Sequence, residues 1–149
     1  MSNQKINPEQ GYQSILFVWF ALLISQLMFL FVVFFIKPEL FVFDLTRPLL
    51  GENAAVVLAF AALSAASVIA SIVIRNRFLH QSVAEQNIAH VQTAMIAGCA
   101  LAEVVSLLGL MLAFAFDYQY FFLFSIASIV ATLLHFPRRS SVHAAAFKQ

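Results

Sequence analysis

Residues 94–114, AMIAGCALAEVVSLLGLMLAF, form an apolar stretch with a carboxyl group at its centre. Apart from Ser106, the clearly polar side chain in this stretch is that of Glu103. A bilayer core of about 30 Å is crossed by about 20 apolar residues in a helix. The stretch therefore predicts a membrane-spanning helix with an ionisable group buried in it, and this prediction decides the fold class.

Three further segments have the same character, so the whole chain is interpreted as a membrane protein. Backbone polar groups in a bilayer must be satisfied within each segment, which favours helices. We expect an all-α, integral membrane, antiparallel four-helix bundle that forms a single transmembrane domain over residues 1–149. The expected helices cover residues 14–36, 53–74, 91–116 and 119–136.

Composition supports this class and excludes others. Hydrophobic residues make up 62% of the chain and charged residues 10%, against roughly 45–50% and about 25% in typical globular domains. A net charge of +1 leaves no basic surface for nucleic acid. Cys99 is the one cysteine, so disulfides and cysteine zinc sites are excluded. Without a nucleophile–base pair, a phosphate loop or facing histidines, we expect no enzyme, no metal and no cofactor.

Charge distribution predicts the orientation of the helices. With four spans, both termini and the polar segment 75–90 share one side of the membrane. That side carries six basic residues against two, Lys37 and Arg47, on the other, so we expect it to be cytoplasmic. The six are Lys5, Arg75, Arg77, Arg138, Arg139 and Lys148. We expect a multi-pass protein of the bacterial inner membrane whose first helix is retained and not cleaved as a signal peptide.

Side-chain size predicts which helices pack together. Segment 14–36 is bulky and rich in Phe on all faces, which indicates broad exposure to lipid. Segment 53–74 is rich in Ala and Ser, and segment 91–116 carries a stripe of small residues at every fourth position. Small residues let membrane helices approach closely, so these two segments are the expected close pair. The stripe consists of Ala94, Gly98, Ala102 and Ser106.

Glu103 lies about 13 residues into its helix, or roughly 19 Å along the axis at ~1.5 Å per residue. This places it near the middle of the bilayer, where no Lys or Arg has a matching depth. Because desolvation disfavours a charge, the expected resting form is a neutral carboxylic acid. Ser25 lies at the same depth, and the expected supporting polar layer consists of Gln26, Ser64, Ser67 and Ser106.

The segment around Glu103 resembles the carboxylate-bearing helix of the rotary ATP synthase c subunit, the proteolipid family. The residues that carry this resemblance are Ala100, Leu101, Ala102, Glu103, Gly109 and Leu110. The resemblance covers residues 54–116 and implies that Glu103 binds a proton. Val104 stands where sodium-binding members have Ser or Thr, which favours a proton over sodium. The chain lacks the glycine repeat and the Arg-Gln-Pro loop, and its first and fourth helices are additional. As a whole it resembles small bacterial four-helix membrane proteins that have no established function.

Two interpretations of function follow. In the first, the protein is a proton-binding membrane subunit with Glu103 as the proton site. In the second, it is a structural or assembly subunit of a larger membrane complex, and Glu103 ties helices together by hydrogen bonds. A small-solute transporter is a third, weaker option. In each case we expect the partners to be lipid and either further copies of the chain or other membrane subunits.

Overall fold

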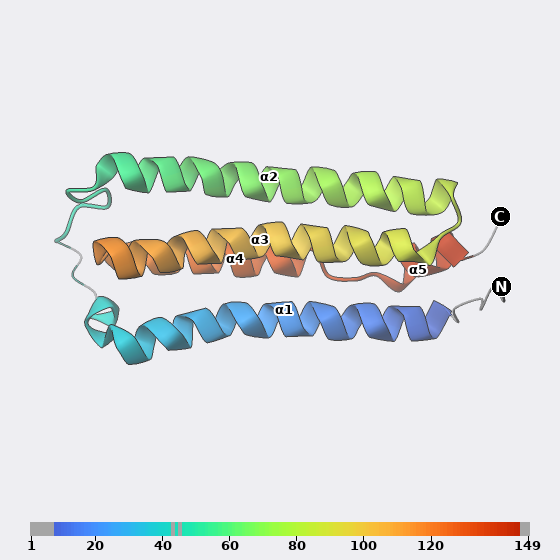
Figure 1. Ribbon diagram of the computed structural model, residues 1–149, viewed down its shortest axis with the longest axis horizontal. Coiled ribbons are helices and arrows are strands. Elements are labelled where there is room, and N and C mark those ends of the chain that lie inside the picture. Colours follow the sequence, from blue (N-terminus) through green and yellow to red (C-terminus); the bar gives the residue numbers. More distant parts are fainter. Residues whose placement is uncertain (1–7, 43, 45, 147–149) are drawn as a thin grey trace.

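The computed structural model describes residues 8–42, 44 and 46–146, and within these residues it is helical without strands. Three long helices run antiparallel, and two shorter ones lie beside and beyond the third (Figure 1). The elements are α1 (Pro8–Ile36), η1 (Pro38–Phe41), α2 (Ala54–Ala84), α3 (Ile88–Phe116), η2 (Gln119–Phe121), α4 (Phe122–Leu134) and α5 (Arg139–Ala146).

Helices α1, α2 and α3 are each long and apolar enough to cross a membrane. They match three of the four expected segments, as in a multi-pass membrane protein. Lys5 and Lys148, which contribute to the predicted charge asymmetry, lie outside the described residues. One end of the bundle contains the start of α1, the turn from α2 to α3, and α5 (Figure 1). We call this the terminal end, and we call the other the opposite end.

The predicted fourth helix, 119–136, corresponds to η2 and α4, which together end two residues earlier, at Leu134. The chain breaks after Leu134, and α5 is bent by 48° to η2–α4, as in a broken span or a re-entrant loop. The described residues thus form five α-helices and not four. The cause is Pro137, which has no backbone N–H and disfavours helical backbone in the residue before it. The α-helix cannot pass through this position, although the side chains before it are apolar.

The polar segment 75–90 is mostly helical, which corrects its interpretation as a loop. Helix α2 continues to Ala84 and α3 begins at Ile88, and the side chain of Asn87 accepts a hydrogen bond from the N–H of Ala89 at the start of α3. Segment 75–90 holds neither Gly nor Pro, so α2 continues past its apolar run until the turn at residues 85–87, where Gln86 has a φ of 51°. Hydropathy marks where the apolar surface ends, and the helix runs beyond that boundary.

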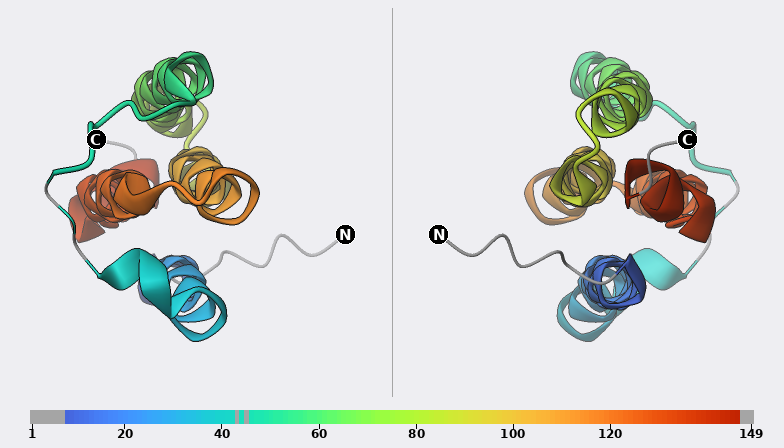
Figure 2. Two further views of the ribbon diagram at one scale, coloured as in Figure 1. Left: turned by 90° about the vertical axis from the view of Figure 1, so that its left-hand side faces the viewer. Right: turned by 90° about the vertical axis from the view of Figure 1, so that its right-hand side faces the viewer.

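Packing centres on α3. Viewed along the axes, α3 and α4 lie side by side between α2 and α1 (Figure 2). The most extensive helix contact is that of α2 with α3, which confirms the expected close pair. The small-residue stripe of α3 nevertheless also faces α4, because the Ser128 hydroxyl donates to the Ala102 carbonyl at 2.7 Å. As expected for α1, large side chains remain uncovered, with Phe17 76% and Phe35 78% exposed.

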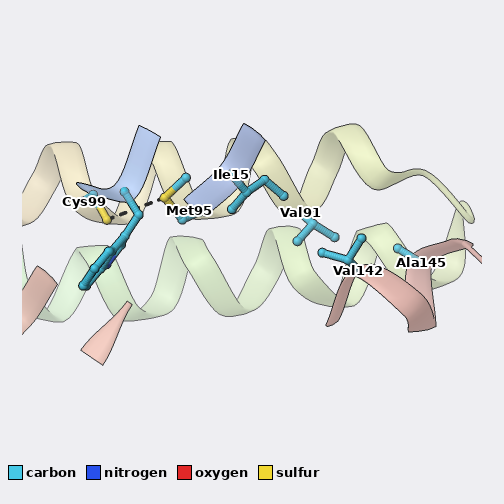
Figure 3. Packing of buried hydrophobic residues seen from close by; sticks show 7 residues of the cluster. Ile15, Val91, Met95, Cys99, Val142 and Ala145 are labelled. Atoms are coloured by element: carbon cyan, nitrogen blue, oxygen red, sulfur yellow. Dashed lines mark hydrogen bonds between the residues drawn. The ribbon is translucent and has the colours of Figure 1, made fainter. Parts of the chain in front are cut away.

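Helix α5 closes the terminal end of the bundle. Its residues Val142 and Ala145 are buried against Ile15 of α1 and Val91 of α3 (Figure 3). The same cluster includes Met95 and the buried Cys99, whose Sγ lies 3.9 Å from the Met95 sulfur. The segment after Pro137, which carries Arg138 and Arg139, therefore forms part of the packed fold.

At the opposite end, Lys37 joins α1 to the end of α3. Its ammonium group donates to the carbonyls of Ala113 and Phe114, at 3.2 Å each, and pairs with the carboxylate of Asp117. The last carbonyls of a helix have no partner within the helix and carry partial negative charge. Lys37 thus caps α3 with a cation from a different helix.

Candidate functional site

Glu103 lies next to Ala102, the middle residue of α3, and its side chain is half-buried towards α1. The Ser25 hydroxyl and the carboxyl Oε1 of Glu103 are 2.5 Å apart. This contact joins α1 to α3 near the middle of both helices. Ser25 is also only partly buried, so the pair sits at a seam between two helices and not at the centre of the bundle.

The Ser25 hydroxyl has two oxygen acceptors within hydrogen-bond distance. The Ser25 oxygen also lies 2.8 Å from the Leu22 carbonyl of its own helix. A hydroxyl has one hydrogen and two acceptor lone pairs. That hydrogen can be donated to Glu103 Oε1 or to the Leu22 carbonyl, so the hydroxyl links the carboxyl group to the backbone of α1.

Gln26, predicted to support Glu103, is fully buried but faces a different helix. Its Nε2 donates to the Thr132 hydroxyl of α4 at 2.7 Å, while its Oε1 is buried without a partner. Trp19 of α1 donates from its indole nitrogen to the Thr132 carbonyl at 2.9 Å. These bonds join α1 to α4, so the structure does not bring Gln26 to the carboxyl group.

Among the described residues, no hydrogen bond joins Glu103 to the three serines of the predicted polar layer. Ser64 and Ser67 are buried on α2, and Ser106 is buried on α3. The hydroxyls of Ser64 and Ser106 have no hydrogen-bond partner. The residue that does contact the carboxyl group is Ser25, whose matching depth was the one signal for it in the sequence.

A second polar group inside the bundle is His135, which directly follows α4. It is 1% exposed, and its Nδ1 lies 2.7 Å from the Ala131 carbonyl, to which it donates. Its Nε2 is buried without a hydrogen-bond partner. In the sequence this residue stands near the end of an apolar run. The ring enters the space left by Gly98 of α3.

The opposite end carries an open pocket of about 540 Å³ between segment 47–53 and the α3–α4 connection. Tyr118 and Tyr120 hold segment 47–53 by donating to the carbonyls of Leu49 and Arg47, at 2.8 Å each. Burial raises the pKa of the Tyr118 phenol above its ordinary value, and the neighbouring Tyr120 adds to this. Tyr118 therefore remains a donor in neutral solution.

Within the described part of the chain, no three His, Cys, Asp or Glu side chains are grouped so as to hold a metal ion. Comparison of the sequence and the structure with protein-family models, curated proteins and solved structures finds no match. The resemblance to the c subunit therefore rests on the sequence around Glu103, and the function is argued from the geometry of this site.

Proposed function

We propose that the protein is a proton-binding membrane subunit in which Glu103 takes up and releases a proton at the α1–α3 seam. The observation that carries this proposal is the 2.5 Å contact between Glu103 and Ser25 near the middle of both helices. In this arrangement the helices span a bacterial inner membrane, with the terminal end in the cytoplasm. The protein works with further copies of itself or with other membrane subunits.

The surroundings of Glu103 favour a neutral carboxyl group at rest. Among the described residues, no Lys, Arg or His forms an ion pair with it. A charge at the centre of a bilayer costs about 2.5–3.5 kcal/mol on insertion scales. The carboxyl group is also not sealed inside the protein, because its side chain is only half-buried. A neutral acid at an accessible seam can exchange its proton when water or a partner subunit reaches it.

Labelling with a hydrophobic carbodiimide tests the proposal, because this reagent reacts with protonated carboxyl groups that lipid can reach. The protein is reconstituted in vesicles, labelled across a pH series, and the modified residue is located by peptide mass spectrometry. We expect Glu103 to be labelled at neutral pH and labelling to fall as the pH is raised further. E103Q provides the unlabelled control, and S25A tests whether the hydroxyl governs reactivity.

The second candidate function, a structural or assembly subunit, is favoured by the same contact interpreted differently. The Ser25–Glu103 bond ties α1 to α3, and α1 presents bulky aromatic side chains outwards. Side-chain hydrogen bonds between membrane helices average only about 0.6 kcal/mol, which is small beside the cost of inserting a charge. Folded protein in which Glu103 is unlabelled at every pH would support this second function and count against proton binding.

A further inference from the structure

A narrow pocket at the terminal end brings two arginines together from distant parts of the chain. Arg75 enters it from α2, and Arg138 and Ser141 enter it from the segment around the start of α5. His135 also lines the pocket. The pocket thus gathers hydrogen-bonding groups from three elements at the point where the chain breaks after α4.

The two arginines have no counter-charge within the protein. Among the described residues, neither Arg75 nor Arg138 forms an ion pair with a carboxylate. Both arginines line the same pocket, and Arg75 is partly buried while Arg138 is exposed. A partly buried positive charge beside a second one in the same pocket is unfavourable unless an anion lies between them.

The neighbouring Arg139 shows the contrast. It pairs with Glu9 of α1 at 3.3 Å, and its guanidinium lies 5.0 Å from the centre of the Tyr12 ring. This arginine therefore has a carboxylate and an aromatic face as partners. Arg77, two residues beyond Arg75 on α2, is exposed and does not line the pocket. Among the described residues, Arg75 and Arg138 thus differ from Arg139 in that neither has a carboxylate partner.

Four of the ten residues that line the pocket carry hydrogen-bonding side chains, and the other six are apolar. Helix α5 begins at Arg139, beside the pocket, and its first turn presents backbone N–H groups and a partial positive charge. Arginine guanidinium groups suit oxyanions because their fixed N–H fork matches two oxygens at once.

Size and depth restrict the ligand further. The pocket has a volume of about 10 Å³, which is about the space of one water molecule. It accepts one oxygen atom, while the rest of the anion stays outside with the exposed Arg138. Arg75 directly follows the apolar run 54–74 and therefore marks the end of the apolar surface of α2. An anion bound here lies at the depth of lipid headgroups.

We propose that Arg75 and Arg138 clamp a phosphate group at this pocket, one oxygen entering it and the others meeting the exposed guanidinium. The phosphate belongs to an anionic lipid headgroup or is free phosphate, since both offer the same chemistry. This site is independent of proton binding at Glu103. Its occupation would hold the α4–α5 break against α2.

Binding to defined bilayers and to a free anion tests the proposal. The full chain is placed in phosphatidylcholine nanodiscs with increasing phosphatidylglycerol, and its thermal unfolding is followed together with the lipid retained after extraction into neutral detergent. Inorganic phosphate is titrated in parallel in detergent without lipid. Four variants are compared: R75Q and R138Q in the pocket, and R77Q and R139Q as controls with the same change in charge.

We expect at least one of the two probes to stabilise the protein against thermal unfolding in a saturable manner. R75Q and R138Q should each weaken the apparent affinity for that probe about tenfold or more, as for a lost hydrogen bond between charged groups. R77Q and R139Q should change this affinity less than twofold. Response to phosphatidylglycerol alone identifies a lipid headgroup, and response to phosphate as well identifies a site open to the free anion. The proposal is overturned if neither probe saturates, or if the control variants lose as much affinity as the pocket variants. R75K keeps the positive charge but lacks the guanidinium fork. Comparing the thermal unfolding of R75K and R75Q without either probe shows whether a loss of affinity in R75Q comes from a loss of folding.

Discussion

The imidazole ring of His135 rests directly on the backbone of Gly98. A Cβ atom added at residue 98 would lie 2.1 Å from Cδ2 and 2.6 Å from Nε2 of that ring, so no other residue type fits there without movement. The ring thereby fills the place where α4 stops and the chain turns towards α5. The imidazole ring of His135 therefore occupies the space that the missing side chain of Gly98 leaves on α3.

The first prediction concerns this match. G98A should destabilise the protein by about 1–3 kcal/mol, the usual cost of overpacking a core, because the ring is held by the Ala131 carbonyl and cannot simply withdraw. Thermal or denaturant unfolding in detergent measures the change. In an H135A background, where the clash is absent, the same substitution should cost less than about 0.5 kcal/mol. An equal cost in both backgrounds would show that the ring does not occupy this space.

Lys37 gives a second prediction. K37M removes a cation from the end of α3 and should destabilise the protein by up to about 2 kcal/mol, the upper range for a charge at a partly buried helix end. K37R keeps the charge and the donors and should cost less. D117N, which removes only the exposed partner of the ion pair, should cost less than K37M because the two carbonyl contacts remain. Unfolding free energies of K37M and wild type that agree within error would contradict the capping role.

Thr132 of α4 gives a third prediction. T132V has nearly the same shape but leaves the buried Nε2 of Gln26 without its acceptor, which should cost about 1–3 kcal/mol. The double variant Q26L/T132V removes both polar groups and should recover part of that loss. T93V is the matched control, since the Thr93 hydroxyl is exposed and bonds only its own helix. If T132V and T93V behaved alike, the α1–α4 bond would not contribute to stability.

A fourth prediction concerns the α2–α3 turn. Hydrogen bonds from Gln81 and then from His90 hold the pKa of Glu85 below its ordinary value. A lowered folded-state pKa means that this interaction stabilises the turn above the unfolded-state pKa and is lost as the pH falls through the folded-state pKa. NMR titration of the Glu85 side-chain carbon should show a midpoint below that of a free glutamate. Q81A should move it upwards, and a midpoint unchanged by Q81A would contradict the assignment.

Adjacent residues Ser25 and Gln26 show what the sequence could and could not predict. Depth along a helix follows from counting residues, so the sequence correctly placed both near the depth of Glu103. Rotation about the axis does not follow, because α1 is apolar on every face and gives no periodic signal. One residue turns the side chain by about 100°, and this step sends Ser25 to α3 and Gln26 to α4.

The break after α4 follows from Pro137 in the sequence, but the burial of His135 could not be predicted, for a related reason. Hydropathy detects apolar side chains, and residues 119–136 are apolar up to the break at Pro137. It does not report that His135 can be buried, because burial here depends on the absence of a side chain at residue 98 on another helix. The close pairing of α2 with α3, in contrast, was predictable because small residues are abundant on both.

The last prediction separates the two roles of Glu103. If the carboxyl group is protonated and donates to Ser25, infrared spectra at neutral pH should contain the carbonyl band of a hydrogen-bonded carboxylic acid that is lost in E103Q. In S25A the same band should move to higher frequency, because the hydrogen bond that weakens the carbonyl is lost. E103Q should change stability by less than about 1 kcal/mol, since the amide can replace the bond. A spectrum with only carboxylate bands at this site would mean that Glu103 is charged at rest, and a charged group at a membrane midplane needs a cationic partner that the described residues do not supply. That result would place the partner on another subunit and make Glu103 a contact for assembly.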